Sequence, residues 1–245
     1  MTDNINDQLV LIGGESGTGK SASLESLTKL PNQEGVMYLN CEAGKRLPFR
    51  NKFTSFTITD PYQVHEAMDH AKGNPAFHTV VVDTLTFLMD MFETQYVLTS
   101  ANTMQAWGAY NQFFKILMQE KVAALDKAVV ILAHTRSELD EKAMEMKTNV
   151  PVKGALRNNG VEAYFSTVVA TKKVSLKDLE PYQSDLLHIT ETDQLLGYKH
   201  VFQTQLTKNT IGERIRSPMG LFSRAETFMD NDCGLLLKHL REYYA

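Results

Sequence analysis

The stretch QLVLIGGESGTGKS (Gln8 to Ser21) decides the fold. Its first half is a short apolar run that ends in glycines, which is typical of a buried strand entering a tight loop. From Gly14 onward, the residues match the pattern G-x-x-x-x-G-K-[S/T] in full. The segment after Ser21 carries leucines at helical spacing. Strand, glycine-rich loop and helix together predict a phosphate-binding site, because backbone N–H groups and the helix N-terminus would surround an anion.

The predicted nucleotide-binding loop has eight residues. Lys20 would reach the β- and γ-phosphates of a nucleotide, and the Ser21 hydroxyl would bind Mg²⁺. The alternative is a glycine-rich turn that carries Lys-Ser by chance, and the flanking strand and helix argue against it. The loop comprises Gly14, Glu15, Ser16, Gly17, Thr18, Gly19, Lys20 and Ser21.

An acidic candidate ends the run TVVVD (Thr79 to Asp83). A carboxylate at the carboxyl end of a parallel strand lies at the edge where such sheets bind their ligands. Asp83 is therefore predicted to hold the Mg²⁺ shell together with Ser21. The alternative is an aspartate that only caps the following helix.

Strands alternate with helices as far as Thr135, which predicts an α/β fold with a mainly parallel sheet flanked by helices. Arg136 to Gly154 is charged and weakly periodic, so we expect a long loop there. Two later strands are expected to be antiparallel neighbours, and the whole chain, 1–245, is expected to form one domain. The expected strands span 8–14, 35–42, 53–60, 78–86, 127–135, 163–174 and 198–209, and the helices 21–30, 61–71, 85–98, 104–125 and 231–244.

Composition narrows the class of protein. The chain has 245 residues, of which 43% are hydrophobic and 22% charged, which is ordinary for a globular protein. The formal net charge of −4 does not suggest nucleic acid. The lone cysteines Cys41 and Cys233 support neither a disulfide framework nor a zinc site, so we expect a reducing cytoplasm. We expect no membrane association, because no apolar run has the length of a membrane span and the polar N-terminus is not a signal peptide.

Three stretches, in order, resemble the core of the RecA-type ATPases. They are GESGTGKS, VMYLNCEAG and FTITDPYQVHEAMDHAKGNPAFHTVVVDTLTFL, so the resemblance covers residues 8–135. Within that class the chain is most similar to a compact phage group, the RecA-like nucleotide-binding ATPases associated with single-strand annealing recombination. The shared features are VVVDTLTFL, a helix with Trp and Tyr, the strand end AH, then VKG, and TKN followed by Arg.

The resemblance implies roles for residues that composition alone leaves open. Glu42 stands where this family has its catalytic glutamate, and His134 stands where it has a polar sensor of the γ-phosphate. Otherwise Glu42 is a surface acid after a strand, and His134 is a strand-end histidine. RecA-type ATPases often take a cation from the neighbouring subunit. The candidates, each of which is otherwise a solvated surface cation, are Lys153, Lys208, Arg214 and Arg216.

The implied function is a Mg²⁺-dependent ATPase in phage DNA recombination or replication, in the host cytoplasm if the protein is phage-encoded. The working form would be a homo-oligomer that binds single-stranded DNA, with an annealing or single-strand-binding protein as a further partner. The segment expected to contact DNA, around Ser137 to Val152, is not basic. DNA binding therefore follows from the resemblance and not from the composition.

Two alternatives to this function stay open. A nucleotide or small-molecule kinase usually brings a lid with several arginines over the phosphates, whereas Arg136 to Gly154 has only one. An ATP-gated loader or adaptor would bind a protein partner and show no DNA-stimulated turnover. Strand order distinguishes the kinase from the RecA type. In the RecA type, another strand lies between the strands that carry Lys20 and Asp83, whereas in the kinase type these two strands lie side by side.

Overall fold

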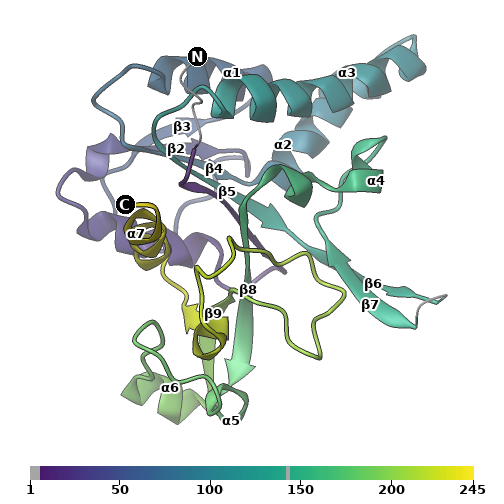
Figure 1. The fold of residues 1–245 in the computed structure, drawn as a ribbon. Coiled ribbons are helices and arrows are strands. Elements are labelled where there is room, and N and C mark those ends of the chain that lie inside the picture. The colour runs from purple at the N-terminus through teal and green to yellow at the C-terminus, as the bar shows by residue number, and fades with distance from the viewer. Residues whose placement is uncertain (1–5, 142–143) are drawn as a thin grey trace.

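The computed structural model describes residues 6–141 and 144–245. Met1 to Ile5, in the polar N-terminal segment, and Lys142 and Ala143, in the segment expected to contact DNA, lie outside the described residues. The centre of the fold is an eight-stranded sheet with the order β10-β9-β8-β1-β5-β4-β2-β3 (Figure 1). The strands are β1 (Leu9–Gly14), β2 (Val36–Asn40), β3 (Thr54–Thr57), β4 (Thr79–Asp83), β5 (Ala128–His134), β8 (Thr167–Ser175), β9 (Tyr198–Gln203) and β10 (Phe228–Asp230).

Six of these strands, β8 through β3 in the sheet order, run parallel, and β9 pairs antiparallel with both β8 and β10. The predicted α/β class is therefore confirmed, including the antiparallel late strands. β9 ends at Gln203, so the predicted strand over 198–209 was too long, and β10 was not predicted. β2 ends at Asn40, two residues before Glu42, because the chain turns there.

The central strands β1, β2, β4 and β5 are buried on both faces, and this explains their continuous apolar runs. Along β1, Leu11 packs into one core while Val10 and Ile12 pack into the other. Helices α1 (Tyr62–Ala71), α2 (Leu85–Phe92) and α3 (Thr103–Ile116) cover the first face. The second face is covered by η1 (Ser21–Lys29), a 3₁₀ helix, and by α7 (Cys233–Tyr244).

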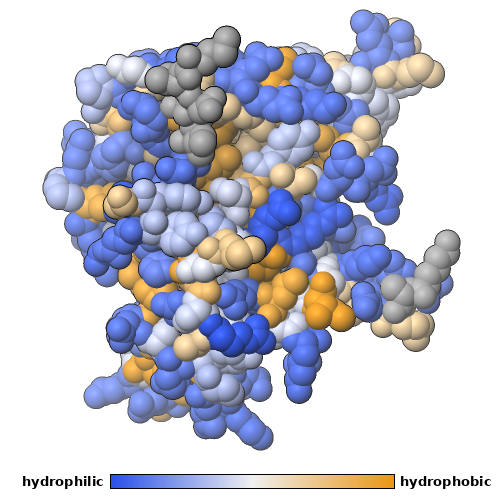
Figure 2. Space-filling view, in the orientation of Figure 1, coloured by the Kyte–Doolittle hydropathy of each residue, from blue (hydrophilic) through white to orange (hydrophobic). Residues whose placement is uncertain are grey.

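The remaining helical segments are short. Two of them continue α2 and α3 as π-helical turns, so the predicted helices over 85–98 and 104–125 are confirmed as composite elements. The outer surface in the view of Figure 2 is mainly hydrophilic. Within the described part of the chain, no helix is long and apolar enough to cross a bilayer. The short segments are η2 (Gln33–Gly35), η3 (Glu93–Val97), η4 (Leu117–Val122), α4 (Leu156–Asn159), η5 (Val161–Tyr164), α5 (Leu176–Leu179), α6 (Glu191–Leu196) and η6 (Arg224–Thr227).

The prediction of a long loop from Arg136 to Gly154 is wrong. Most of it forms a hairpin, β6 (Arg136–Asp140) paired antiparallel with β7 (Glu145–Asn149). The hairpin projects from the body of the protein (Figure 1). Both of its strands are largely exposed, so no apolar alternation marks them in the sequence. Cross-strand polar contacts, such as Ser137 with Thr148, accompany the pairing instead.

Strand order answers the question left open by the sequence. β5 lies between β1, which leads to Lys20, and β4, which ends in Asp83. This is the RecA-type order. The kinase alternative requires β1 and β4 to be adjacent, and they are not.

A buried histidine gives a pH prediction for folding. His65 of α1 stacks on Phe113 with ring centroids 4.4 Å apart, and its Nε2 has no hydrogen-bond partner. Burial lowers the pKa of His65, and the nearby Lys121 ammonium lowers it further, while Asp69 opposes the shift. A folded-state pKa below the unfolded value means that acid adds protons preferentially to the unfolded chain.

We therefore expect the urea midpoint of the wild type to fall as the pH drops below about 6.5, the unperturbed histidine value. His65→Met should flatten this dependence. His70→Gln, a change at an exposed histidine of the same helix, should leave it intact. Urea denaturation at several pH values measures this dependence of the midpoint on pH. An equally steep dependence in His65→Met would contradict the assignment of the effect to His65.

Candidate active site

The phosphate loop curls around the ammonium of Lys20. Lys20 is 6% exposed, and its Nζ donates to the carbonyl oxygens of Gly14 and Glu15, both at 2.8 Å. Gly17 and Gly19 have positive φ angles of 76° and 109°, which glycine adopts without strain. Burial lowers the pKa of Lys20 to about 8, although the charges of nearby carboxylates oppose the shift. An anionic ligand would offset this desolvation, so the loop is suited to phosphate.

Three side chains from the C-terminal half contact the loop from outside. The Thr171 hydroxyl of β8 lies so close that a Cβ on Gly14 would meet its Oγ1 at 2.0 Å. His200 of β9 donates through Nδ1 to the Thr18 carbonyl at 2.7 Å, since a carbonyl oxygen can only accept. Asn231, just after β10, donates to the Gly19 carbonyl at 2.9 Å. No pattern in the sequence marks these contacts, because they join residues far apart in the chain.

Asp83 ends β4 beside Ser21. It is 2% exposed, and its Oδ2 accepts hydrogen bonds from the Ser21 hydroxyl at 3.0 Å and the Tyr38 hydroxyl at 2.8 Å. Burial raises the pKa of Asp83, and the Tyr38 hydrogen bond opposes the rise. Its hydrogen bonds go to these hydroxyls and not to the N-terminus of α2, so capping is not its role. Tyr38 was not singled out from the sequence.

The donors present at Asp83 fit a magnesium ion. The Oδ1 atom of Asp83 is buried and has no hydrogen-bond partner, which leaves a carboxylate oxygen to be satisfied. Among the described residues, no group of three or more histidine, cysteine or acidic side chains could hold a metal alone. Mg²⁺ usually keeps waters and takes one or two protein oxygens plus substrate phosphates. Ser21 and Asp83 supply protein oxygens of that kind.

A second hydrogen-bonded series joins Lys20 to Glu42. His134, at the end of β5, contacts Lys20 Nζ through Nδ1 at 3.2 Å and Glu42 Oε1 through Nε2 at 3.2 Å. The Lys20 ammonium can only donate, so Nδ1 of His134 accepts. The ring proton is therefore on Nε2, which donates a hydrogen bond to Glu42. Lys45 Nζ donates to the other oxygen of Glu42 at 2.8 Å.

The two donors decide the charge state of Glu42. Burial alone would raise the pKa of this carboxyl group, but the hydrogen bonds from Lys45 and His134 outweigh burial and keep the pKa below its usual range. Glu42 is therefore ionised near neutral pH and shielded, with a side chain only 8% exposed.

One cavity of about 340 Å³ brings these groups together. Its wall includes Lys20, Ser21, Glu42, Asp83 and His134. The sequence placed each of these residues at the carboxyl edge of a strand or in the phosphate loop, and the structure brings all five to one cavity. Lys45, Arg46 and His200 also line it.

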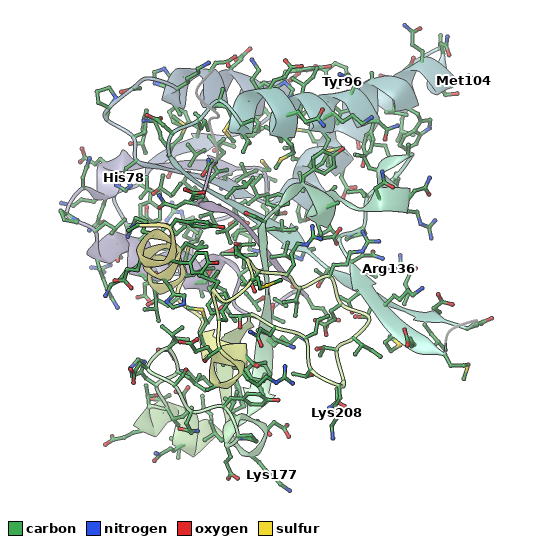
Figure 3. The ribbon with its side chains drawn as sticks, viewed as in Figure 1. His78, Tyr96, Met104, Arg136, Lys177 and Lys208 are labelled. Atoms are coloured by element: carbon green, nitrogen blue, oxygen red, sulfur yellow. The ribbon has the colours of Figure 1, made fainter. Side chains whose placement is uncertain are left out.

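The four cations expected to act on a neighbouring subunit lie apart from this cavity. Lys153 pairs with Glu93 at 2.6 Å, and Arg214 pairs with the buried Glu162 at 3.1 Å. Lys208 and Arg216 are exposed, and within the described residues neither forms an ion pair. Lys208 points away from the body of the protein (Figure 3).

One protein family and several solved structures are similar to this chain. A family model described as an AAA domain matches residues 6–210. Among solved structures, the chain is similar to one described as an ATPase domain (14% identity, TM-score 0.42, 74% of each chain covered). It is also similar to "Crystal structure of the RadB recombinase" (15% identity, TM-score 0.40, 69% of this chain and 76% of that chain covered). At this level neither similarity bears on function. Comparison with curated proteins gave no match.

Proposed function

Since the chain belongs to the AAA-domain family, we propose that it binds ATP with Mg²⁺ and hydrolyses it in phage DNA recombination or replication. The observation that carries the proposal is the hydrogen-bonded series from Lys20 through His134 to Glu42, which shares a cavity with Ser21 and Asp83. A plain nucleotide binder needs the phosphate loop alone. Hydrolysis also requires a base, and a shielded, ionised carboxylate in the same cavity can supply it.

The roles of the side chains follow from their positions. Lys20 leaves the loop carbonyls for the β- and γ-phosphate oxygens, and Ser21 and Asp83 would hold a magnesium ion. A magnesium ion held there would supply positive charge against the negative charge that develops on the phosphates. Glu42 orients a water whose oxygen bonds to the γ-phosphorus while the bond from phosphorus to the bridging oxygen breaks. A proton of that water passes to Glu42, and ADP and inorganic phosphate leave.

His134 links the reaction to the hairpin. The first residue of the hairpin, Arg136, follows His134 after a single intervening residue. Displacement of the hairpin by a ligand would therefore act on the ring that contacts both Lys20 and Glu42. We propose single-stranded DNA as that ligand, on the basis of the RecA-like sequence and strand order.

The proposal predicts that single-stranded DNA raises ATP turnover about fivefold or more, a typical coupling between two sites. The stimulation should weaken with salt, because phosphate contacts are screened. Arg136→Glu should reduce the stimulation without changing turnover in the absence of DNA. Lys177→Glu, at an exposed lysine distant from the hairpin (Figure 3), is the matched control.

Steady-state phosphate release with and without DNA measures this effect. Turnover that DNA leaves unchanged would favour the ATP-gated loader or adaptor instead.

We further propose a homo-oligomer as the working form, with an annealing or single-strand-binding protein as a second partner. The exposed Lys208 and Arg216 support this proposal, because they are free to reach a neighbouring copy.

A further inference from the structure

Both carboxylate oxygens of Glu42 are engaged by donors. His134 donates to Oε1 and Lys45 donates to Oε2. A carboxylate with two such donors is a weak base, because both stabilise its charged form. Loss of one donor would therefore make Glu42 a stronger base toward water.

Lys45 is the donor that can leave. The His134 ring is fixed on its other side by Lys20 and contacts Phe87 edge-on, with ring centroids 5.7 Å apart. The Lys45 side chain, in contrast, is 67% exposed, so it can turn to a new partner without disturbing the core. The Lys45 ammonium can therefore leave Glu42 for an anion of greater charge, such as a phosphate group.

The turn fixes the backbone of Lys45 at the cavity, whereas its side chain is largely exposed. The buried Asn40 bridges the turn, since its Oδ1 accepts from Glu42 N at 3.0 Å and its Nδ2 donates to the Lys45 carbonyl at 2.8 Å. Lys45 N in turn donates to the Glu42 carbonyl at 3.0 Å. Ala43 and Gly44 have φ angles of 51° and 77°, which make the turn tight.

We infer that Lys45 is a catalytic cation supplied by the same chain: on ATP binding its ammonium moves from Glu42 to the γ-phosphate. This inference rests on the proposed ATP hydrolysis. A single movement then has two results. It frees one oxygen of Glu42 to orient water, and it places positive charge where the transition state develops negative charge. Of the cations considered, the four expected to act on a neighbour lie outside the cavity, whereas Lys45 lines it.

The test compares wild type, Lys45→Met, Lys45→Arg and Lys177→Met. Lys45→Met keeps most of the length of the side chain and removes its charge, so kcat should fall about tenfold to a hundredfold. Lys45→Arg should recover part of the loss. Lys177→Met changes an exposed lysine that does not line the cavity and should match the wild type.

Nucleotide affinity provides a readout that needs no turnover. Lys45→Met should weaken binding of the non-hydrolysable β,γ-imido analogue of ATP about fivefold or more, because one contact with the γ-phosphate is lost. Binding of ADP, which lacks the γ-phosphate, should stay close to wild type. Equal losses for the two nucleotides, no loss for either, or a kcat at or above wild type in Lys45→Met would each overturn the inference. Phosphate release by the wild type tests the proposed hydrolysis separately. The affinities for the ATP analogue and for ADP can be compared whether or not ATP is hydrolysed.

Discussion

Glu42→Gln is expected to bind ATP within a few-fold of wild type and to lose about a hundredfold to a thousandfold in kcat, the usual contribution of a positioned general base. The substitution keeps an oxygen that can accept from His134 and removes the charge that draws a proton from water. Because Lys20, Ser21 and Asp83 are untouched, binding should survive.

Glu25→Gln is the matched control, since Glu25 is an exposed glutamate of η1 next to the phosphate loop. It should turn over like the wild type. Phosphate release at saturating ATP gives kcat, and calorimetry gives the affinity. Near wild-type turnover in Glu42→Gln would remove Glu42 from the mechanism and leave the cavity as a binding site only.

Asp83→Asn is expected to abolish the effect of Mg²⁺ on ATP binding and to reduce hydrolysis by at least about a hundredfold. Asparagine keeps an oxygen that accepts from Ser21 and Tyr38, so the local structure should persist. What it lacks is the negative charge, and with it the buried oxygen that has no hydrogen-bond partner in the protein. The loss should therefore be specific to the metal.

ATP affinity measured with Mg²⁺ and with a chelator separates the two effects. The wild type and Asp126→Asn, a change at an aspartate whose side chain is 72% exposed, should bind more tightly with Mg²⁺. Asp83→Asn should bind equally in both conditions. An Asp83→Asn protein that still gains affinity from Mg²⁺ would show that other groups hold the ion.

The parts of the site that could be predicted from sequence are those in which chemistry and local pattern coincide. Strand, loop and helix follow one another within Leu9 to Lys29, so the phosphate loop has a complete local signature. Asp83 and His134 each end an apolar strand. Since parallel strands present their carboxyl ends at one edge, their proximity follows from the α/β pattern.

Other parts depend on packing between distant segments. Thr171, His200 and Asn231 reach the phosphate loop from the last third of the chain, and no motif marks them. The order of strands could not be derived either, because the same alternation of strands and helices suits both RecA-type and kinase-type sheets. The exposed hairpin was missed, since neither of its faces is buried in a core and its residues show no period.

Lys45 illustrates a third limit. In the sequence it is one of several basic residues after a strand. Its relation to Glu42 depends on the turn that Asn40 closes, and that turn requires two left-handed residues in succession. Only the folded backbone shows that these residues form one unit.

The central claim is that Glu42 converts a nucleotide-binding loop into an ATPase. The most direct measurement is the identity of the nucleotide that stays bound after the protein is incubated with ATP and Mg²⁺ and separated from free nucleotide. The wild type should retain ADP, and Glu42→Gln should retain intact ATP. ADP in both proteins, or intact ATP in both, would contradict the account.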